Sequence, residues 1–134
     1  MNQLIAKVIH IKNVDTLHYL TFSLNQQVIH MLSLELEPKF KIGTLVPLTV
    51  KSTHVALSKE LNSVSSLDNR LIGTIVSLEE GEILASICLE IEGFLLESII
   101  SRESRELMNL QAEDTVAVLI NSADISIVHA VQDV

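Results

Sequence analysis

The sequence predicts a mainly β protein made of two small barrels in tandem, and three observations support this. Leu, Ile and Val dominate the composition, with 48% apolar but only 3% aromatic residues, which is typical of buried strands. Apolar and polar residues alternate with a period of two along several short segments. The pattern of the first part of the chain returns about 67 residues later. A chain of 134 residues is long enough for one domain or two very small ones.

The repeat becomes visible when the chain is aligned with itself. Three pairs of segments correspond: 2–9 with 69–76 and 17–22 with 84–89 at an offset of 67, and 46–55 with 116–125 at an offset of 70. The three extra residues fit a loop or a short helix between strands. A polar, Ser-rich stretch separates the copies. We therefore divide the chain into repeat 1 (residues 1–60), a linker (61–67) and repeat 2 (68–134).

In repeat 1, alternation over residues 4–11 predicts a strand, and the apolar pattern at 17–22 predicts a second. Another strand is expected at 45–51, after a turn at Gly43. Between them, Pro38 limits residues 35–40 to a short helical turn, because proline cannot continue a helix.

In repeat 2, the segments 83–92 and 94–100 are joined by Glu92-Gly93, which predicts a hairpin. Ser101 can cap a helix that continues to Met108. A strand is expected at 115–121. Four or five short strands with one helical turn per copy indicate a small barrel of the OB type. Units of this size bury little surface alone, so we expect interfaces between repeats or subunits.

The charge balance excludes several functions. The net charge is −8, which disfavours nucleic acids and anionic membranes as partners. Repeat 1 with its linker carries six lysines against four acids, whereas repeat 2 carries three arginines against thirteen acids. This asymmetry suggests two units with different electrostatic roles, or surfaces that simply drifted apart. No apolar run approaches a membrane span and the start lacks a signal-peptide core, so we expect a soluble cytoplasmic protein.

The sequence offers little catalytic chemistry. It contains no nucleophile elbow, phosphate-binding loop, dinucleotide fingerprint or zinc-protease motif. The single cysteine, Cys88, lies within a strand and is expected to be a buried apolar residue. The histidines lack the spacing of metal ligands. We therefore expect no enzyme, no catalytic residue and no direct ligand of a metal cation.

The remaining chemistry is the binding of a small oxyanion. A tetrahedral dianion is held by backbone N–H groups at a helix or turn start, by hydroxyls and by a cation. Ser101 and Ser104 lie in the first turn of the expected helix, and 51–53 and 121–123 each end a strand and open a turn. Plain helix capping and ordinary polar turns explain these residues equally well.

Repeat 2 resembles a Mop domain, the molybdate-binding repeat of the TOBE group. The family pattern S-x-x-N-x-L-x-G-x-V, a helix start I-T-x-x-S, L-x-x-G/E-D-x-V and a K-A-S-x-V/I ending are matched in order by 66–75, 100–104, 110–116 and 121–125. Repeat 1 is similar but more divergent, with matches at 2–8 and 51–55. The resemblance covers nearly the whole chain, although each motif alone is loose.

The resemblance implies OB-like barrels that exchange strands, a trimer of tandem chains, and molybdate or tungstate sites between repeats and subunits. The oxyanion-binding candidates that it implies are Asn2, Gln3, Lys51, Ser52, Thr53, Asn69, Arg70, Ser101, Ser104, Ser122 and Ala123. The implied function is storage, buffering or delivery of the oxyanion. The alternative is an oligomerising interaction module of a molybdenum pathway that stores no anion. A pterin-cofactor binder is disfavoured, because the chain has no Trp and few aromatic residues.

The chain departs from the family pattern at three places. Asn121 stands where the family usually has Lys, residues 32–35 replace the helix start in repeat 1, and Ala6 replaces the glycine matched by Gly73. We therefore expect composite sites, in which Lys51 of one repeat faces the serine-bearing helix start of the other. Lys51→Ala would then abolish more sites than its own repeat holds. The rival interpretation is that one class of site is dead.

Overall fold

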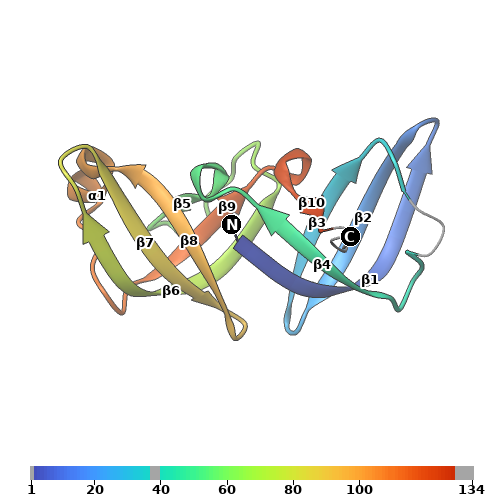
Figure 1. Cartoon of the computed structure of the whole chain (residues 1–134), viewed down its shortest axis with the longest axis horizontal. Coiled ribbons are helices and arrows are strands. Elements are labelled where there is room, and N and C mark those ends of the chain that lie inside the picture. Colours follow the sequence, from blue (N-terminus) through green and yellow to red (C-terminus); the bar gives the residue numbers. More distant parts are fainter. Residues whose placement is uncertain (1, 37–39, 129–134) are drawn as a thin grey trace, which may run out of the picture.

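The computed structural model describes residues 2–36 and 40–128, which form two five-stranded antiparallel sheets side by side (Figure 1). The strands of the first half are β1 (Asn2–Val14), β2 (Leu17–Leu24), β3 (Gln27–Ser33), β4 (Leu45–Val50) and β5 (Ala56–Ser58). Those of the second half are β6 (Asn69–Glu80), β7 (Leu84–Ile91), β8 (Phe94–Ser101), β9 (Thr115–Ile120) and β10 (Ser126–Ile127). The only α-helix in the described residues is α1 (Arg102–Met108). The predicted mainly β, tandem fold is confirmed.

The last short strand of each half belongs to the sheet of the other half. The first sheet has the order β10-β4-β1-β2-β3, and the second has the order β5-β9-β6-β7-β8. The strand exchange that the resemblance implied is thus present within one chain. Two 3₁₀ turns precede the exchanged strands: η1 (Ser52–His54) before β5 and η2 (Ser122–Asp124) before β10. The exchange places both turns in the middle of the molecule, between the two sheets (Figure 1).

The two halves repeat each other in detail. The pairing of β1 with β2 shifts register between Val8 and His10, and that of β6 with β7 shifts between Ile75 and Ser77, which lie 67 residues further on. Such a shift marks a β-bulge, which bends a strand and increases its twist. Each bulge lets its sheet curl around the apolar core, whose buried residues form one cluster that includes both halves. That core contains alternate residues of the first strand in each half, as the period of two predicts.

Most predicted elements are found at the expected places. The Glu92-Gly93 hairpin is present, and both residues have positive φ angles, 50° and 88°. Positive φ at both central residues matches the twist of the flanking strands. The expected helical turn at residues 35–40 falls partly on 37–39, which lie outside the described residues. No helix in the described part of the chain has the length and apolarity needed to cross a membrane.

Gly73 is required by close packing between β6 and its neighbours. A Cβ atom there would lie 2.9 Å from Cγ1 of Ile91 and 3.2 Å from the carbonyl oxygen of Glu90. The corresponding residue of repeat 1 is the fully buried Ala6, and Leu24 occupies the place of Ile91. A leucine branches one carbon further from the backbone than an isoleucine, which explains why repeat 1 has room for the methyl group.

We expect Gly73→Ala to lower the free energy of unfolding by about 1–3 kcal/mol, the usual cost of overpacking a core. Chemical denaturation measures this change. Adding Ile91→Leu to Gly73→Ala recreates the arrangement of repeat 1 and is expected to restore part of the stability. A Gly73→Ala protein as stable as the parent chain would contradict the packing argument.

Candidate functional site

The candidate site is centred on the two 3₁₀ turns, which face each other between the sheets. His54 at the end of η1 lies 3.8 Å from Asp124 at the end of η2, measured from Nδ1 to Oδ1. The residues before the turns are Lys51 and Asn121, both in extended conformation. The structure therefore brings together five of the sequence-predicted residues: Lys51, Ser52, Thr53, Ser122 and Ala123.

The first turn keeps free hydrogen-bond donors. Within the described residues, the backbone N–H groups of Ser52 and Thr53 have no partner, and Lys51 makes no capping hydrogen bond. The side chains of Lys51 and Thr53 are exposed. The Ser52 hydroxyl donates to Oε1 of Glu97 at 2.9 Å. The Lys51 cation, the two N–H groups and the Thr53 hydroxyl are groups of the kind that hold an oxyanion.

At the second turn, the backbone N–H groups already donate to side chains of the same chain. The backbone N–H of Ser122 donates to Oδ1 of Asp68 at 2.7 Å, and that of Ala123 donates to the side-chain oxygen of Asn121 at 2.9 Å. The Tyr19 hydroxyl donates to the other Asp68 oxygen at 2.8 Å. Asn121 thus acts as a cap of η2 in the position where the family pattern has a lysine.

The carboxylates at the two turns have lowered pKa values. Burial acts to raise the pKa of Asp68, but hydrogen bonds from Ser122 and Tyr19 outweigh it and bring the pKa below its ordinary value. Burial and the Asp68 carboxylate both raise the pKa of Tyr19. Hydrogen bonds from the hydroxyls of Ser86 and Ser52 lower the pKa of Glu97. Both acids therefore stay ionised at neutral pH.

Asn2 and Asn69 hold the two sheets together. The Asn69 side chain accepts from the backbone N–H of His30 at 2.6 Å and donates to its carbonyl oxygen at 2.8 Å. Asn2 makes the same pair of bonds with the backbone of Glu97, both at 2.7 Å. Both asparagines are buried. Asn69 begins β6 of the second sheet and bonds to β3, the edge strand of the first sheet. Asn2 begins β1 of the first sheet and bonds to β8, the edge strand of the second sheet.

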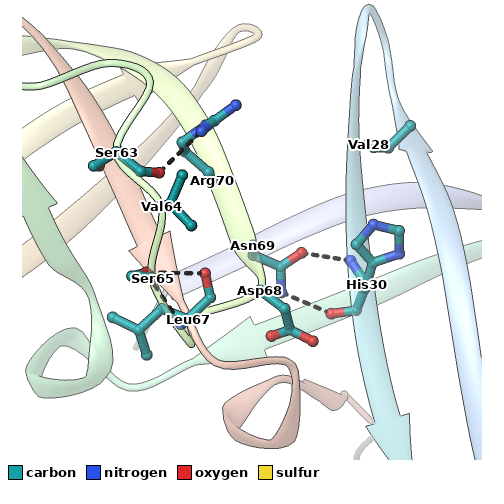
Figure 2. A pocket seen from close by; sticks show the side chains of 9 residues that line it. All are labelled: Val28, His30, Ser63, Val64, Ser65, Leu67, Asp68, Asn69 and Arg70. Carbon is teal, nitrogen blue, oxygen red and sulfur yellow. Dashed lines mark hydrogen bonds between the residues drawn. The ribbon is translucent and has the colours of Figure 1, made fainter.

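A cavity of about 320 Å³ lies beside Asn69, between β3 and the linker (Figure 2). The His30 ring stacks on Tyr19 with centroids 5.4 Å apart, and its Nδ1 lies 3.0 Å from the Thr21 hydroxyl. The guanidinium of Arg70 donates to the carbonyl of Ser63 at 2.9 Å and points away from Asp68 (Figure 2). The cavity wall therefore has a cation at one end and a carboxylate at the other.

The remaining predicted residues lie away from the turns of this chain. The Ser101 hydroxyl accepts from the backbone N–H of Ser104 at 3.0 Å, so it caps α1 as the simpler interpretation expected. Helix α1 lies at the outer end of the second sheet (Figure 1). No hydrogen bond or ion pair within the described residues connects Lys51 to Ser101 or Ser104. Gln3 lies exposed on β1, opposite Thr49 of β4.

The sequence analysis missed four residues of this region: Tyr19, His30, Asp68 and Glu97. One signal was available, because Glu97 follows His30 by the repeat offset of 67, and both face an asparagine of the other half. An acid is not expected at an anion site, and the sequence gives Asp68 no signal beyond its place in the family motif. Among the described residues, no group of three His, Cys, Asp or Glu side chains is placed to hold a metal ion.

Comparisons with known proteins agree with this architecture. The TOBE domain model matches residues 65–127. The structure superposes on the cytoplasmic molybdate-binding protein ModG, crystallised with molybdate bound, with a TM-score of 0.86 and 20% identity over 94% of each chain. This likeness shows the fold. No curated protein sequence matches the chain.

Two single-repeat structures match about half of the chain. A molybdate-binding protein from Sporomusa ovata matches with 25% identity and a TM-score of 0.44, covering 45% of this chain and 90% of its own. MopII from Clostridium pasteurianum matches with 32% identity and a TM-score of 0.47, covering 50% of this chain and all of its own.

Proposed function

Residues 65–127 of this chain are a TOBE domain, and from that premise we propose that the protein binds molybdate or tungstate. Its role is to store, buffer or deliver the oxyanion in the cytoplasm, by binding and release and without catalysis. The fold shared with a molybdate-binding protein over 94% of both chains supports this proposal. The proposal also includes the division of the chain into repeat 1 (1–60), a linker (61–67) and repeat 2 (68–134).

The observation that carries the proposal is the open set of donors at the first turn. Lys51 supplies a positive charge, Thr53 supplies a hydroxyl, and Ser52 and Thr53 supply backbone N–H groups that have no partner among the described residues. Charge-assisted hydrogen bonds of this kind are about twice as strong as neutral ones. A tetrahedral dianion can accept from all of these groups at once.

We propose that the complete sites form between chains of a homotrimer. Ser101 and Ser104 lie too far along the second sheet to join Lys51 of the same chain, so a helix start can face Lys51 only from another chain. Exposed apolar residues support such an assembly, because they recur at the repeat offset: Ile5 with Ile72, Ile9 with Val76, Leu17 with Leu84, and Val28 with Leu95. Burial of these side chains against another chain would remove apolar surface from water.

Native mass spectrometry of the full chain, titrated with molybdate, tungstate and sulfate in turn, tests this function. We expect a trimer that takes up molybdate or tungstate and leaves sulfate in solution. A chain that binds none of the three anions at millimolar concentration would overturn the proposal.

One observation favours the alternative of an interaction module without anion storage. Most of the predicted anion donors already have internal partners: the hydroxyls of Ser52 and Ser101, the N–H groups of Ser122 and Ala123, the side-chain amides of Asn2 and Asn69, and the Arg70 guanidinium. The same titration separates the two functions. A stable trimer that binds no anion is the result expected of the interaction module.

A further inference from the structure

Both 3₁₀ turns hold a carboxylate that belongs to the chain itself. Asp68 is bound at the second turn by the N–H and hydroxyl of Ser122, and Glu97 is bound at the first turn by the Ser52 hydroxyl. The two acids are not equivalent in the repeat: the residue 67 positions before Glu97 is His30. Each turn therefore binds a negatively charged oxygen, and the two oxygens come from different positions in the repeat. This indicates that both turns attract oxyanions.

The two turns differ in how completely they are occupied. At the first turn, Glu97 takes only the Ser52 hydroxyl and shares its other oxygen with Ser86. At the second turn, Asp68 takes the Ser122 donors, and Asn121 takes the N–H of Ala123. Ser122 is only 4% exposed, so its donors are also shielded from solvent.

Asp68 is held firmly in this place. Tyr19 donates to its second oxygen, and the Tyr19 ring stacks on His30, whose backbone is fixed by Asn69. A dianion approaching Ser122 would have to displace a carboxylate that already has several donors. It would also meet the negative charge of Asp68 at close range, where Coulomb repulsion is strong.

We propose that Asp68 makes an autoinhibitory contact, closing the second turn to oxyanions and confining their binding to the first turn. This inference rests on the proposed function and specifies which of the two repeat-related turns is active. The closed turn stabilises the junction between the sheets, and the open turn binds the ligand. Each chain then contributes one functional turn in place of two.

Isothermal titration of the full chain with sodium molybdate tests the inference. We expect the parent chain to bind through the first turn alone, and Asp68→Ala to raise the number of molybdate ions bound by about one per chain. Asp68→Asn removes the charge while keeping the shape of the side chain, so it is the variant to use if the alanine protein does not fold. Glu82→Ala is the matched control, because it removes an exposed acid of the same half without touching either turn.

The amide resonances of the two turns give a second readout in a ¹⁵N-labelled parent chain. Adding molybdate is expected to shift the amides of Ser52 and Thr53 and to leave that of Ser122 unchanged. A shift of Ser122 equal to that of Ser52, or an unchanged stoichiometry in both Asp68 variants, would overturn the inference while leaving the proposed function intact. Absence of binding by the parent chain and by every variant would instead refute the proposed function.

Discussion

Lys51→Ala is expected to weaken molybdate binding by about 10- to 100-fold. A hydrogen bond to a charged group contributes about 1.5–3 kcal/mol, and each 1.4 kcal/mol corresponds to a factor of ten in affinity. Asn121 occupies the corresponding place in the second turn, so the chain has no second lysine to take over. If the second turn is closed, the loss affects every site and not only half of them. Equilibrium dialysis with molybdate measures both the affinity and the number of ions bound.

Two control variants show whether the effect is local. Lys12→Ala removes the same charge from an exposed position at the far end of β1, and is expected to leave the affinity nearly unchanged. Lys51→Arg keeps the charge and is expected to retain most of the binding. Parental affinity and stoichiometry in Lys51→Ala would show that this lysine binds no anion, and would exclude the composite site between Lys51 and a serine-bearing helix start.

The sequence was sufficient to predict most of the repeated strands, although not β3, because the information is local. Alternation along β1 and β6, the Glu92-Gly93 hairpin and the Ser101 cap each depend on residues that are close in the chain. The same pattern occurring twice, at one offset, then predicted two similar units. Both bulges fall at corresponding places, although nothing in the alternation alone marked them.

The junction between the units could not be predicted in the same way. Strands β5 and β10 contain three and two residues, too few for a period of two to be recognised. Their exchange came only from the family resemblance. The contacts of Asn69 with His30 and of Asp68 with Ser122 join residues 39 and 54 positions apart, and no local pattern indicates such pairs. The motif located the candidate residues, but the long-range contacts decide which donors stay free.

Asn69→Ala is expected to destabilise the fold more than any other polar substitution considered above. It leaves the backbone N–H and carbonyl of His30 without partners in a partly buried place, at about 1–3 kcal/mol for each group. The total of roughly 2–6 kcal/mol corresponds to a melting temperature lower by about 10–20 °C for a chain of this size. Thermal denaturation followed by circular dichroism measures the shift.

The matched controls use asparagines in other environments. Asn62→Ala in the linker removes an exposed amide with no hydrogen bond in the described residues, and is expected to melt like the parent chain. Asn2→Ala breaks the equivalent pair of bonds with Glu97 and is expected to behave like Asn69→Ala. Asn69→Asp keeps an acceptor for the His30 N–H but turns a negative oxygen toward the His30 carbonyl, so it is expected to be no more stable than the alanine variant. If Asn69→Ala has the same melting temperature as Asn62→Ala, the hydrogen bonds between Asn69 and His30 contribute little to stability. The relative position of the two turns must then be set by the exchanged strands alone.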